Sequence, residues 1–389
     1  MSNVANFLVK LMSAGDCAKS MHDIKRTTFM NEEMRKLGCE CELQIFGDTA
    51  NSYCKVGNPN AEHTFCFCGH CDVVPVQPGW TKNPKGEIID GLVYGRGAVD
   101  MLGGVASWYT AISELKQEGK LNDTTLKHVC ISSLFTGDEE INDGDGVKRM
   151  AKYLADKGEK CDVCMIGEPS NYGKNPDDGK LECLTIERGG SFNFGVRIFG
   201  LSGHISAPDR FDNPITKGAK LIVALKEIDW QRKANLEISA FEGMNQTNNV
   251  VLDEVKLRGN VRYFDGLTPE EIYEQIVSTC KNVLGEEKYK LSWKDELRGY
   301  KTDKNNKYIQ LVANSIKKVS GSYEFVGGRG RGCSDGEWLK VLSDNVCEFG
   351  VRIYLCHKKD EYTSIEDLKN LVKIYKTIIL DYIASINEG

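Results

Sequence analysis

The sequence lacks the features that mark several large classes of protein. Only 9 of its 389 residues are proline and 41% are apolar, which argues against a disordered chain. No apolar run is long enough to cross a membrane, and the first residues, MSNVANFLVKLMSAGDC, contain no basic stretch followed by a long apolar core. We therefore expect a globular cytoplasmic protein with no signal peptide and no membrane partner.

A strongly basic composition is also missing. The sequence has 50 lysine and arginine residues against 56 aspartate and glutamate residues, a formal net charge of -6. Proteins that bind nucleic acids need a basic face, so this balance argues against a nucleic-acid partner. The chain also has no internal repeat and no low-complexity segment, which argues against a repeat architecture.

Cysteine is abundant, with 15 residues, but the pattern of a disulfide scaffold is absent. Cys161 and Cys164 form the only C-x-x-C pair, and the lack of a second pair disfavours a zinc or redox role. Free cysteine behaves as a small buried hydrophobic residue, so we expect thiols of a reducing compartment. The cysteines within apolar runs are Cys66, Cys68, Cys130, Cys164, Cys347 and Cys356.

The length of the chain is too great for one ordinary core and predicts two domains. Short apolar runs of β-type composition alternate with helical patterns. The runs span 63–70, 126–135, 160–168 and 344–356, and the helical patterns span 103–119, 145–158 and 364–383. This alternation predicts an α/β domain with a sheet covered on both faces.

The middle of the chain has a different pattern. Residues 189–200 alternate as a strand with one buried face would, and the stretch continues with a helix, a pair of strands at 249–264 and a second helix that begins at Thr268. This β-α-β-β-α block predicts a separate small α+β domain. We expect a larger domain at 1–188 and 297–389, interrupted by the smaller one at 189–296.

Histidines and carboxylates gather where the predicted strands end. Each has an ordinary alternative, such as a core histidine, a helix cap or a solvated acidic loop. Together they favour two divalent metals that share one carboxylate, because the carboxyl ends of strands build the site in open α/β sheets. Nitrogen and oxygen ligands suit zinc, with cobalt or manganese as alternatives. The residues are His70, Asp72, Asp100, Glu139, Glu140, Glu168 and His357.

Two local expectations follow from strand geometry. Side chains two residues apart on a strand point the same way, so the Asp72 carboxylate is expected to accept a hydrogen bond from the His70 ring. Neighbouring side chains on extended backbone diverge, so Glu139 and Glu140 are expected to have different roles.

The motifs GHCDVVP, GRGAVDMLGG, TGDEE, GEPS and GLSGHISAP occur in this order, and the chain from about residue 60 onward resembles the M20 family of two-zinc metallopeptidases. The resemblance implies an α/β catalytic domain interrupted by a small lid domain that pairs in a homodimer. It also implies two divalent metals per chain.

The resemblance assigns roles to matching positions. One metal would be held by His70 and Glu168 and the other by Glu140 and His357, with Asp100 between them. The remaining roles implied are orientation of His70 by Asp72, general base for Glu139, and oxyanion stabilisation across the dimer by His204.

Further motifs, IERGGSF, DNPI, TNNVV, GCSDGEWL and HKKDEYTSIEDL, indicate a subgroup that hydrolyses N-succinyl-LL-2,6-diaminopimelate. N-acetylornithine, other N-acyl amino acids and dipeptides are the alternatives, and a catalytically silent binding protein is disfavoured because every ligand position and Glu139 are present. The substrate-binding residues implied are Arg188, Asn248, Asn249, Arg262, Gly332 and Ser334.

Overall fold

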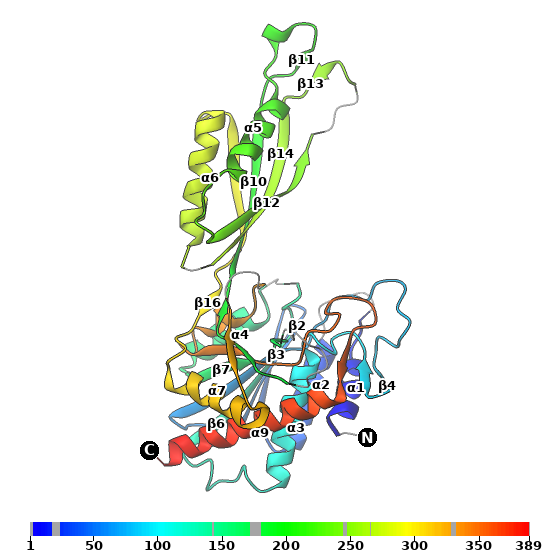
Figure 1. The fold of residues 1–389 in the computed structure, drawn as a ribbon, viewed down its shortest axis with the longest axis vertical. Helices are drawn as coiled ribbons and strands as arrows, with labels where there is room; N and C mark the ends of the chain where they lie inside the picture. The colour runs from blue at the N-terminus through cyan, green and yellow to red at the C-terminus, as the bar shows by residue number, and fades with distance from the viewer. Residues whose placement is uncertain are drawn as a thin grey trace. The chain divides into compact units, whose positions relative to one another are not determined.

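The computed structural model describes residues 3–17, 24–141, 144–171, 180–243, 247–264, 266–327 and 332–388, apart from the side chains of 294–296. The chain divides into two compact units (Figure 1). The first unit comprises Met1–Glu187, Lys301–Gly327 and Ser334–Gly389, and the second comprises Arg188–Tyr300 and Gly328–Cys333. Arg188, residues 297–300 and residues 332–333, which the sequence assigned to the larger domain, group with the second unit.

The first unit contains a large mixed sheet with helices packed against it (Figure 1). Its helices are α1 (Asn3–Ala14), α2 (Ile24–Lys36), α3 (Leu102–Gln117), α4 (Val147–Asp156), α7 (Lys307–Ser320), α8 (Gly336–Leu339) and α9 (Ile365–Asn387). The strands of the large sheet are β1 (Glu40–Phe46), β2 (Thr49–Gly57), β3 (His63–His70), β6 (Val129–Thr136), β7 (Val163–Ile166), β8 (Cys183–Thr185), β17 (Glu324–Val326) and β18 (Val346–Glu348).

The short strands form smaller sheets. β4 (Glu87–Ile89), β5 (Leu92–Tyr94) and β19 (Tyr362–Ser364) make a three-stranded sheet, and β9 (Glu187–Arg188) pairs with β16 (Tyr300–Lys301). Ser364 at the end of β19 caps α9 by accepting a hydrogen bond from the backbone N–H of Asp367 at 2.9 Å.

Four parallel strands define the edge on which the site is built. The large sheet has the order β1-β2-β6-β3-β7-β18-β8-β17, and β3 is parallel to both β6 and β7, while β7 is parallel to β18. The carboxyl ends of these strands therefore meet at one edge of the sheet. The apolar runs predicted at 63–70, 126–135 and 160–168 form β3, β6 and β7.

Aromatic packing fixes the face of the sheet covered by α3 and α9. Phe67 of β3 stacks on Trp108 of α3, with ring centroids 4.6 Å apart and planes 8° apart. The Trp108 indole N–H donates to Ser133 Oγ at 2.7 Å, so its polar atom is satisfied within the core. Tyr375 of α9 meets Phe67 edge-on at 5.7 Å. This packing holds α3, which begins two residues after Asp100, against the strand that ends at His70.

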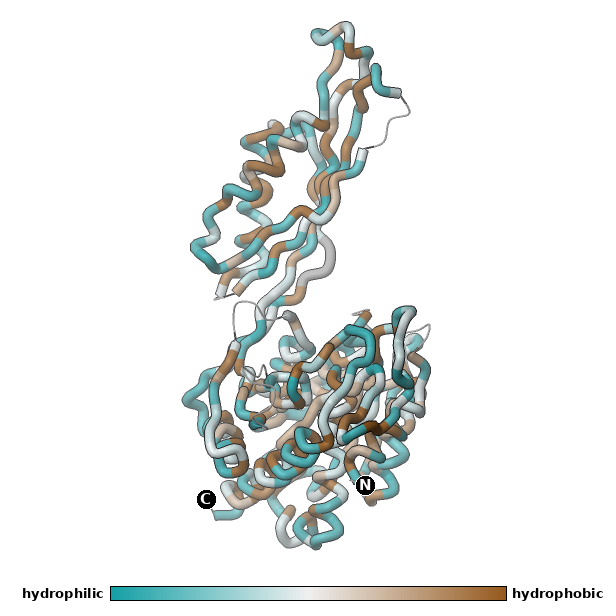
Figure 2. The backbone as a smooth tube through the Cα atoms, turned by 45° about the vertical axis from the view of Figure 1, so that its right-hand side comes forward, coloured by the Kyte–Doolittle hydropathy of each residue, from teal (hydrophilic) through white to brown (hydrophobic). Residues whose placement is uncertain are grey.

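The second unit packs two helices on one face of a four-stranded antiparallel sheet with the order β12-β14-β10-β15. Buried and exposed residues alternate along its central strands, and Figure 2 shows the matching alternation of hydropathy. Its elements are β10 (Gly190–Phe199), β11 (Gly203–His204), the 3₁₀ helix η1 (Pro208–Arg210), α5 (Pro214–Lys226), β12 (Ala234–Glu242), β13 (Val250–Val251), β14 (Glu254–Tyr263), α6 (Pro269–Leu284) and β15 (Tyr289–Leu297).

Two further observations concern the chain as a whole. All 15 cysteines are free thiols. Within the described ranges, each helix is too short or too polar to span a lipid bilayer.

Candidate metal centre and active site

β3 delivers His70 to the carboxyl edge of the large sheet. The imidazole is fully buried, and its Nε2 lies 3.2 Å from Asp100 Oδ1 and 3.4 Å from Glu168 Oε1. Glu168 follows β7, the strand next to β3, so the parallel pairing brings these two side chains together. The three residues form one group whose potential ligand atoms lie within 4.8 Å of one another.

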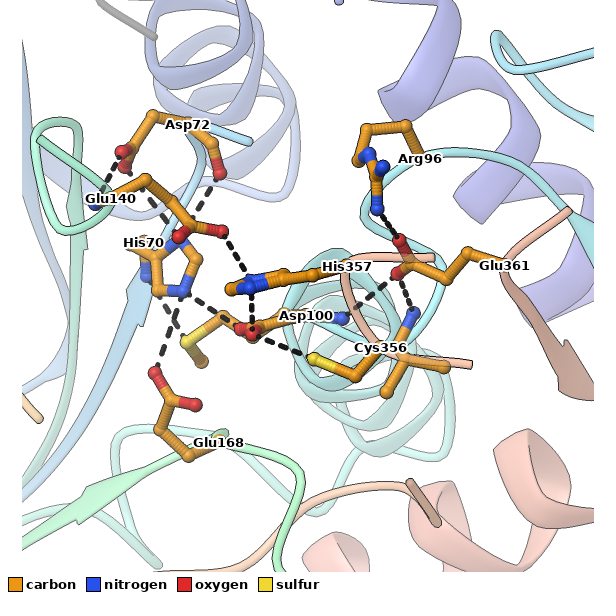
Figure 3. Close-up of polar contacts among 11 residues, drawn as sticks. His70, Asp72, Arg96, Asp100, Glu140, Glu168, Cys356, His357 and Glu361 are labelled. Carbon is orange, nitrogen blue, oxygen red and sulfur yellow. Dashed lines mark hydrogen bonds and ion pairs between the residues drawn. The ribbon is translucent and has the colours of Figure 1, made fainter. Parts of the chain in front are cut away.

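Asp100 occupies the centre of the site. Its Oδ1 faces His70, and its Oδ2 lies 3.1 Å from His357 Nε2, so one carboxylate spans both histidines (Figure 3). It does not cap α3, whose first residue is Leu102 and whose N-cap is Met101 without a side-chain hydrogen bond. The alternative interpretation of Asp100 as a helix cap is therefore ruled out.

His357 and Glu140 lie on the other side of Asp100. His357 Nε2 is 3.1 Å from Glu140 Oε1 (Figure 3). The prediction that His357 ends an apolar strand was wrong, because β18 stops at Glu348 and His357 lies in a turn with φ of 60°. A turn conformation in the left-handed region directs the imidazole to Asp100 instead of continuing the strand.

Asp72 contacts both His70 and the Glu140 loop. Its backbone oxygen accepts a hydrogen bond from His70 Nδ1 at 3.1 Å, while the carboxylate Oδ1 is 3.6 Å from the same nitrogen. The Oδ2 atom accepts the Glu140 N–H at 2.9 Å. The carboxylate was expected to accept the hydrogen bond from the His70 ring, but the carbonyl oxygen of Asp72 makes the shorter contact. Either arrangement leaves Nε2 facing the site.

The acidic segment at 138–140 is a turn, not the extended backbone assumed from the sequence. Asp138 has φ of 84°, and its Oδ2 accepts the N–H groups of Asp145 at 2.7 Å and Gly146 at 3.0 Å just before α4. Asp138 therefore stabilises the loop that leads to α4. Glu139 lies close enough to His70, Glu168 and Asp100 for their charges to affect its pKa.

The carboxylates crowded around His70 and Asp100 favour the binding of positive charge in the site. Burial and the nearby charge of Asp100 raise the pKa of Glu168 to about 7. Burial, together with neighbouring carboxylates, raises the pKa of Glu139 well above its usual value, although His70 opposes this. Burial opposes the charge on His70, but contacts with Asp100, Asp72 and Glu168 raise its pKa well above its usual value. These oxygen and nitrogen donors fit divalent cations, which would replace the protons.

A buried ion pair behind the site was missed from the sequence. Glu361 is fully buried, accepts the backbone N–H groups of Val99 at 2.8 Å and Asp100 at 3.2 Å, and pairs with Arg96 at 2.6 Å (Figure 3). It follows His357 by four residues, so it joins the loops of two proposed ligands. In the sequence HKKDE, Glu361 looks like part of a solvated run of charges, and nothing local marks Arg96 as its partner.

Two more residues near the site were missed. Cys356 Sγ donates to Asp100 Oδ2 at 3.2 Å, although the sequence suggested only a buried hydrophobic role. Asp335 is buried, and burial raises its pKa well above the usual range. No sequence signal separated Asp335 from ordinary acidic residues.

Three residues of the second unit that were predicted to act in catalysis or substrate binding lie where β11 pairs with β13. His204 of β11 pairs with Val250 of β13, which brings the His204 Nε2 to 3.1 Å from the Asn249 amide nitrogen. His204 Nδ1 is 2.8 Å from Ser206 Oγ. His204, Asn248 and Asn249 are all exposed. An amide and an imidazole side by side form a polar group suited to an oxygen of a ligand.

The other predicted substrate residues are dispersed. Arg262 of β14 is exposed and donates to Cys333 Sγ at 3.1 Å, and Arg188 is buried in the second unit. The Ser334 hydroxyl, expected to bind substrate, donates to the buried Glu348 carboxylate at 2.5 Å. A Cβ atom added at Gly332 would have no other atom within 4 Å. The residues just before Gly332, 328–331, lie outside the described residues.

An α/β sheet that gathers two imidazoles and several carboxylates at its strand ends is the arrangement of a metal-dependent hydrolase. Residues 66–381 match the model of the family described as Peptidase family M20/M25/M40. The chain belongs to this metal-dependent family and is a metal-dependent amide hydrolase.

Relatives and solved structures agree with this assignment. The curated succinyl-diaminopimelate desuccinylase of Wolbachia sp. subsp. Brugia malayi (strain TRS) is 33% identical, over 91% of this chain and 88% of the relative. The structure of aminopeptidase PepT from Bacillus cereus ATCC 10987 has a TM-score of 0.78 at 18% identity, covering 97% of this chain and 98% of that one. The Bacillus subtilis YXEP protein, a dinuclear metal-binding M20 peptidase, has a TM-score of 0.71 at 14% identity, with 99% and 98% covered. At these identities the solved structures indicate the fold.

Proposed function

We propose that this protein hydrolyses N-succinyl-LL-2,6-diaminopimelate to succinate and LL-2,6-diaminopimelate, a step of lysine and cell-wall biosynthesis. The single observation that carries the catalytic part is the position of Asp100, whose two oxygens face His70 Nε2 at 3.2 Å and His357 Nε2 at 3.1 Å. The substrate is supported by the desuccinylase name of a relative that is 33% identical over 91% of the chain.

Two divalent cations, with zinc as the first candidate, would lower the pKa of a water molecule and polarise the amide carbonyl. His70 and Glu168 would hold one of them, and Glu140 and His357 would hold the other. Asp100 would contribute one oxygen to each. Asp72 keeps the proton of His70 on Nδ1 through the 3.1 Å contact to its carbonyl oxygen, which leaves Nε2 free to act as a ligand.

Glu139 acts as the general base in this proposal. It takes a proton from the attacking water and returns it to the leaving amine, so that one carboxylate serves both halves of the hydrolysis. Burial and neighbouring carboxylates raise the pKa of Glu139, which makes the ionised form a stronger proton acceptor. This position needs a carboxylate and not an amide.

Residues of the second unit complete the proposal. His204 would donate a hydrogen bond to the oxyanion that develops on the carbonyl, which requires its Nε2 to give up the 3.1 Å contact with the amide nitrogen of Asn249. Arg262 offers a bidentate fork for a substrate carboxylate, with Arg188, Asn248, Gly332 and Ser334 as weaker candidates. We propose further that the second unit pairs in a homodimer and that the enzyme works in the cytoplasm, where its free thiols stay reduced.

The test compares two substrates. Purified zinc-loaded protein is incubated with N-succinyl-LL-2,6-diaminopimelate and, separately, with N-acetylornithine, and release of the free amine is followed. Turnover of the first substrate with little of the second is the expected result. Preferred turnover of N-acetylornithine would overturn the proposed substrate but leave the metal-dependent chemistry, whereas a zinc-loaded protein that cleaves neither would contradict both proposed substrates.

A further inference from the structure

A second cluster of potential metal ligands lies on β3 and β7, four residues before His70 and Glu168. Cys66 of β3 and Cys164 of β7 are register partners on parallel neighbouring strands, so both side chains leave the same face of the sheet. Cys161 precedes β7 and joins them from the adjoining loop, where its N–H donates to Leu342 O at 2.9 Å. The three Sγ atoms lie within 4.8 Å of one another.

This spacing matches the demands of one bound ion. Three sulfurs that share an ion at about 2.3 Å lie roughly 3.8–4.0 Å apart, so the cluster needs only small side-chain movements to close around it. The side chains of all three cysteines are buried, and Cys161 is partly exposed only as a whole residue, so a cation would reach the sulfurs through local opening of the loop before β7. Isolated buried thiols act as small hydrophobic residues, but three converging sulfurs form a ligand set.

We propose that Cys66, Cys161 and Cys164 bind one soft thiophilic cation, Cu(I) or Zn(II), at a site separate from the catalytic centre. Among the described residues, no histidine or carboxylate belongs to this group, so its chemistry is that of thiolate sulfur. Soft thiolate ligands select these two cations, and three sulfurs satisfy Cu(I), whereas Zn(II) would need a fourth ligand.

The site has a structural consequence for the catalytic centre. Cys66 precedes His70 by four residues and Cys164 precedes Glu168 by four residues, which is about 13 Å along a strand. A cation held by Cys66 and Cys164 would therefore link β3 to β7 four residues before His70 and Glu168. Because the cation binds the folded chain, it should raise the melting temperature by an amount that grows with the logarithm of the free cation concentration above the Kd.

The full-length zinc-loaded protein is the material for the test. It is titrated anaerobically, in separate arms, with Cu(I) and with additional Zn(II), and sulfur coordination is read by X-ray absorption together with metal content after gel filtration. The expected result is one additional equivalent in one of the arms, with three sulfur ligands and, for Zn(II), a fourth ligand. The affinity for this equivalent should fall at least tenfold in Cys161→Ser. Matched controls are Cys280→Ser, a lone buried thiol of the second unit, and Cys356→Ser, which tests for binding at the catalytic centre.

A second measurement needs no variant. Alkylation of Cys161 in the wild-type chain, read by peptide mass spectrometry, should slow when the bound cation is present. The proposal is overturned if neither cation acquires a sulfur shell, or if Cys356→Ser and not Cys161→Ser removes it. Unchanged alkylation of Cys161 in the presence of a bound equivalent also overturns it.

Discussion

Asp72, Asp100 and Asp138 carry the same side chain in three environments, and the environment decides what each does. Asp138 accepts two backbone N–H groups and holds a loop, and Asp72 accepts the Glu140 N–H and contacts His70. Asp100 faces two imidazoles, and although burial acts in the other direction, its hydrogen bonds with His357 and His70 lower its pKa. Only Asp100 therefore has both oxygens directed to the two sides of a dinuclear site.

Replacing the proposed general base should separate metal binding from catalysis. Glu139→Gln keeps the size of the side chain but cannot take a proton, so we expect kcat to fall by about 10²–10⁴-fold. Metal content, measured on the same preparation, should stay at the wild-type value because Glu139 is not one of the proposed ligands. The role assigned to Glu139 is wrong if the variant retains near-wild-type turnover.

The buried Glu361 should control metal affinity without touching substrate. Glu361→Gln weakens the ion pair with Arg96 and the support of the Asp100 backbone, so we expect metal affinity to fall by roughly 10–100-fold. Competition with a chelator measures this affinity, and excess metal should restore kcat. Glu366→Gln, an exposed carboxylate at the start of α9, is the matched control. Equal metal affinity in both variants would show that Glu361 has no positioning role.

At the scale of elements, hydrophobic patterning predicted the buried strands with apolar sequences and missed others. The buried strand β2, TANSYCKVG, was missed because several of its buried residues are polar. β3, β6 and β7 are buried almost throughout and read as apolar runs. β12 and β15 were missed because they are the edge strands of the four-stranded sheet. Edge strands tend to be polar, and β12 has only one buried residue, Leu236, so neither period nor composition marked it.

The candidate site was predictable where its residues end strands and not where it depends on long-range contacts. His70 and Glu168 follow buried strands, so the sheet rule placed them. The contact of Glu361 with Asp100 joins residues 261 positions apart, and no local pattern marks such a pair. The turn at His357 was misread for a related reason: the apolar residues after β18, such as Phe349 and Val351, are buried without being in a strand.

The start of α6 offers a test of local stability in the second unit. Thr268 Oγ1 accepts the Glu271 N–H at 3.2 Å while the Glu271 carboxylate accepts the Thr268 N–H at 2.8 Å, a capping box. Thr268→Ala should cost about 1 kcal/mol, which corresponds to roughly fivefold faster native-state hydrogen exchange in α6. Thr279→Ala, at a half-buried position inside the same helix, should not accelerate exchange. Equal exchange in the two variants would mean that the cap does not limit opening of α6.

At the scale of the whole molecule, the proposed machinery is divided between the two units. The five proposed metal ligands and Glu139 belong to the first unit, and His204 belongs to the second. The M20 resemblance implies that His204 serves the neighbouring chain of a homodimer. This arrangement predicts that two defects on different chains can complement each other, whereas a residue acting within its own chain cannot be rescued in this way.

Mixing two inactive variants tests this division. Glu139→Gln and His204→Ala chains are unfolded and refolded together in equal amounts, or co-expressed with different tags and isolated as hybrids. If His204 acts across the dimer, each hybrid has one site with Glu139 and His204 both intact, so a random mixture regains about a quarter of wild-type turnover. If His204 acts within its own chain, every site in the hybrid keeps one defect and turnover stays at the level of the separate variants. Recovery without a dimer in solution would contradict the trans arrangement, so sedimentation of the same mixture completes the measurement.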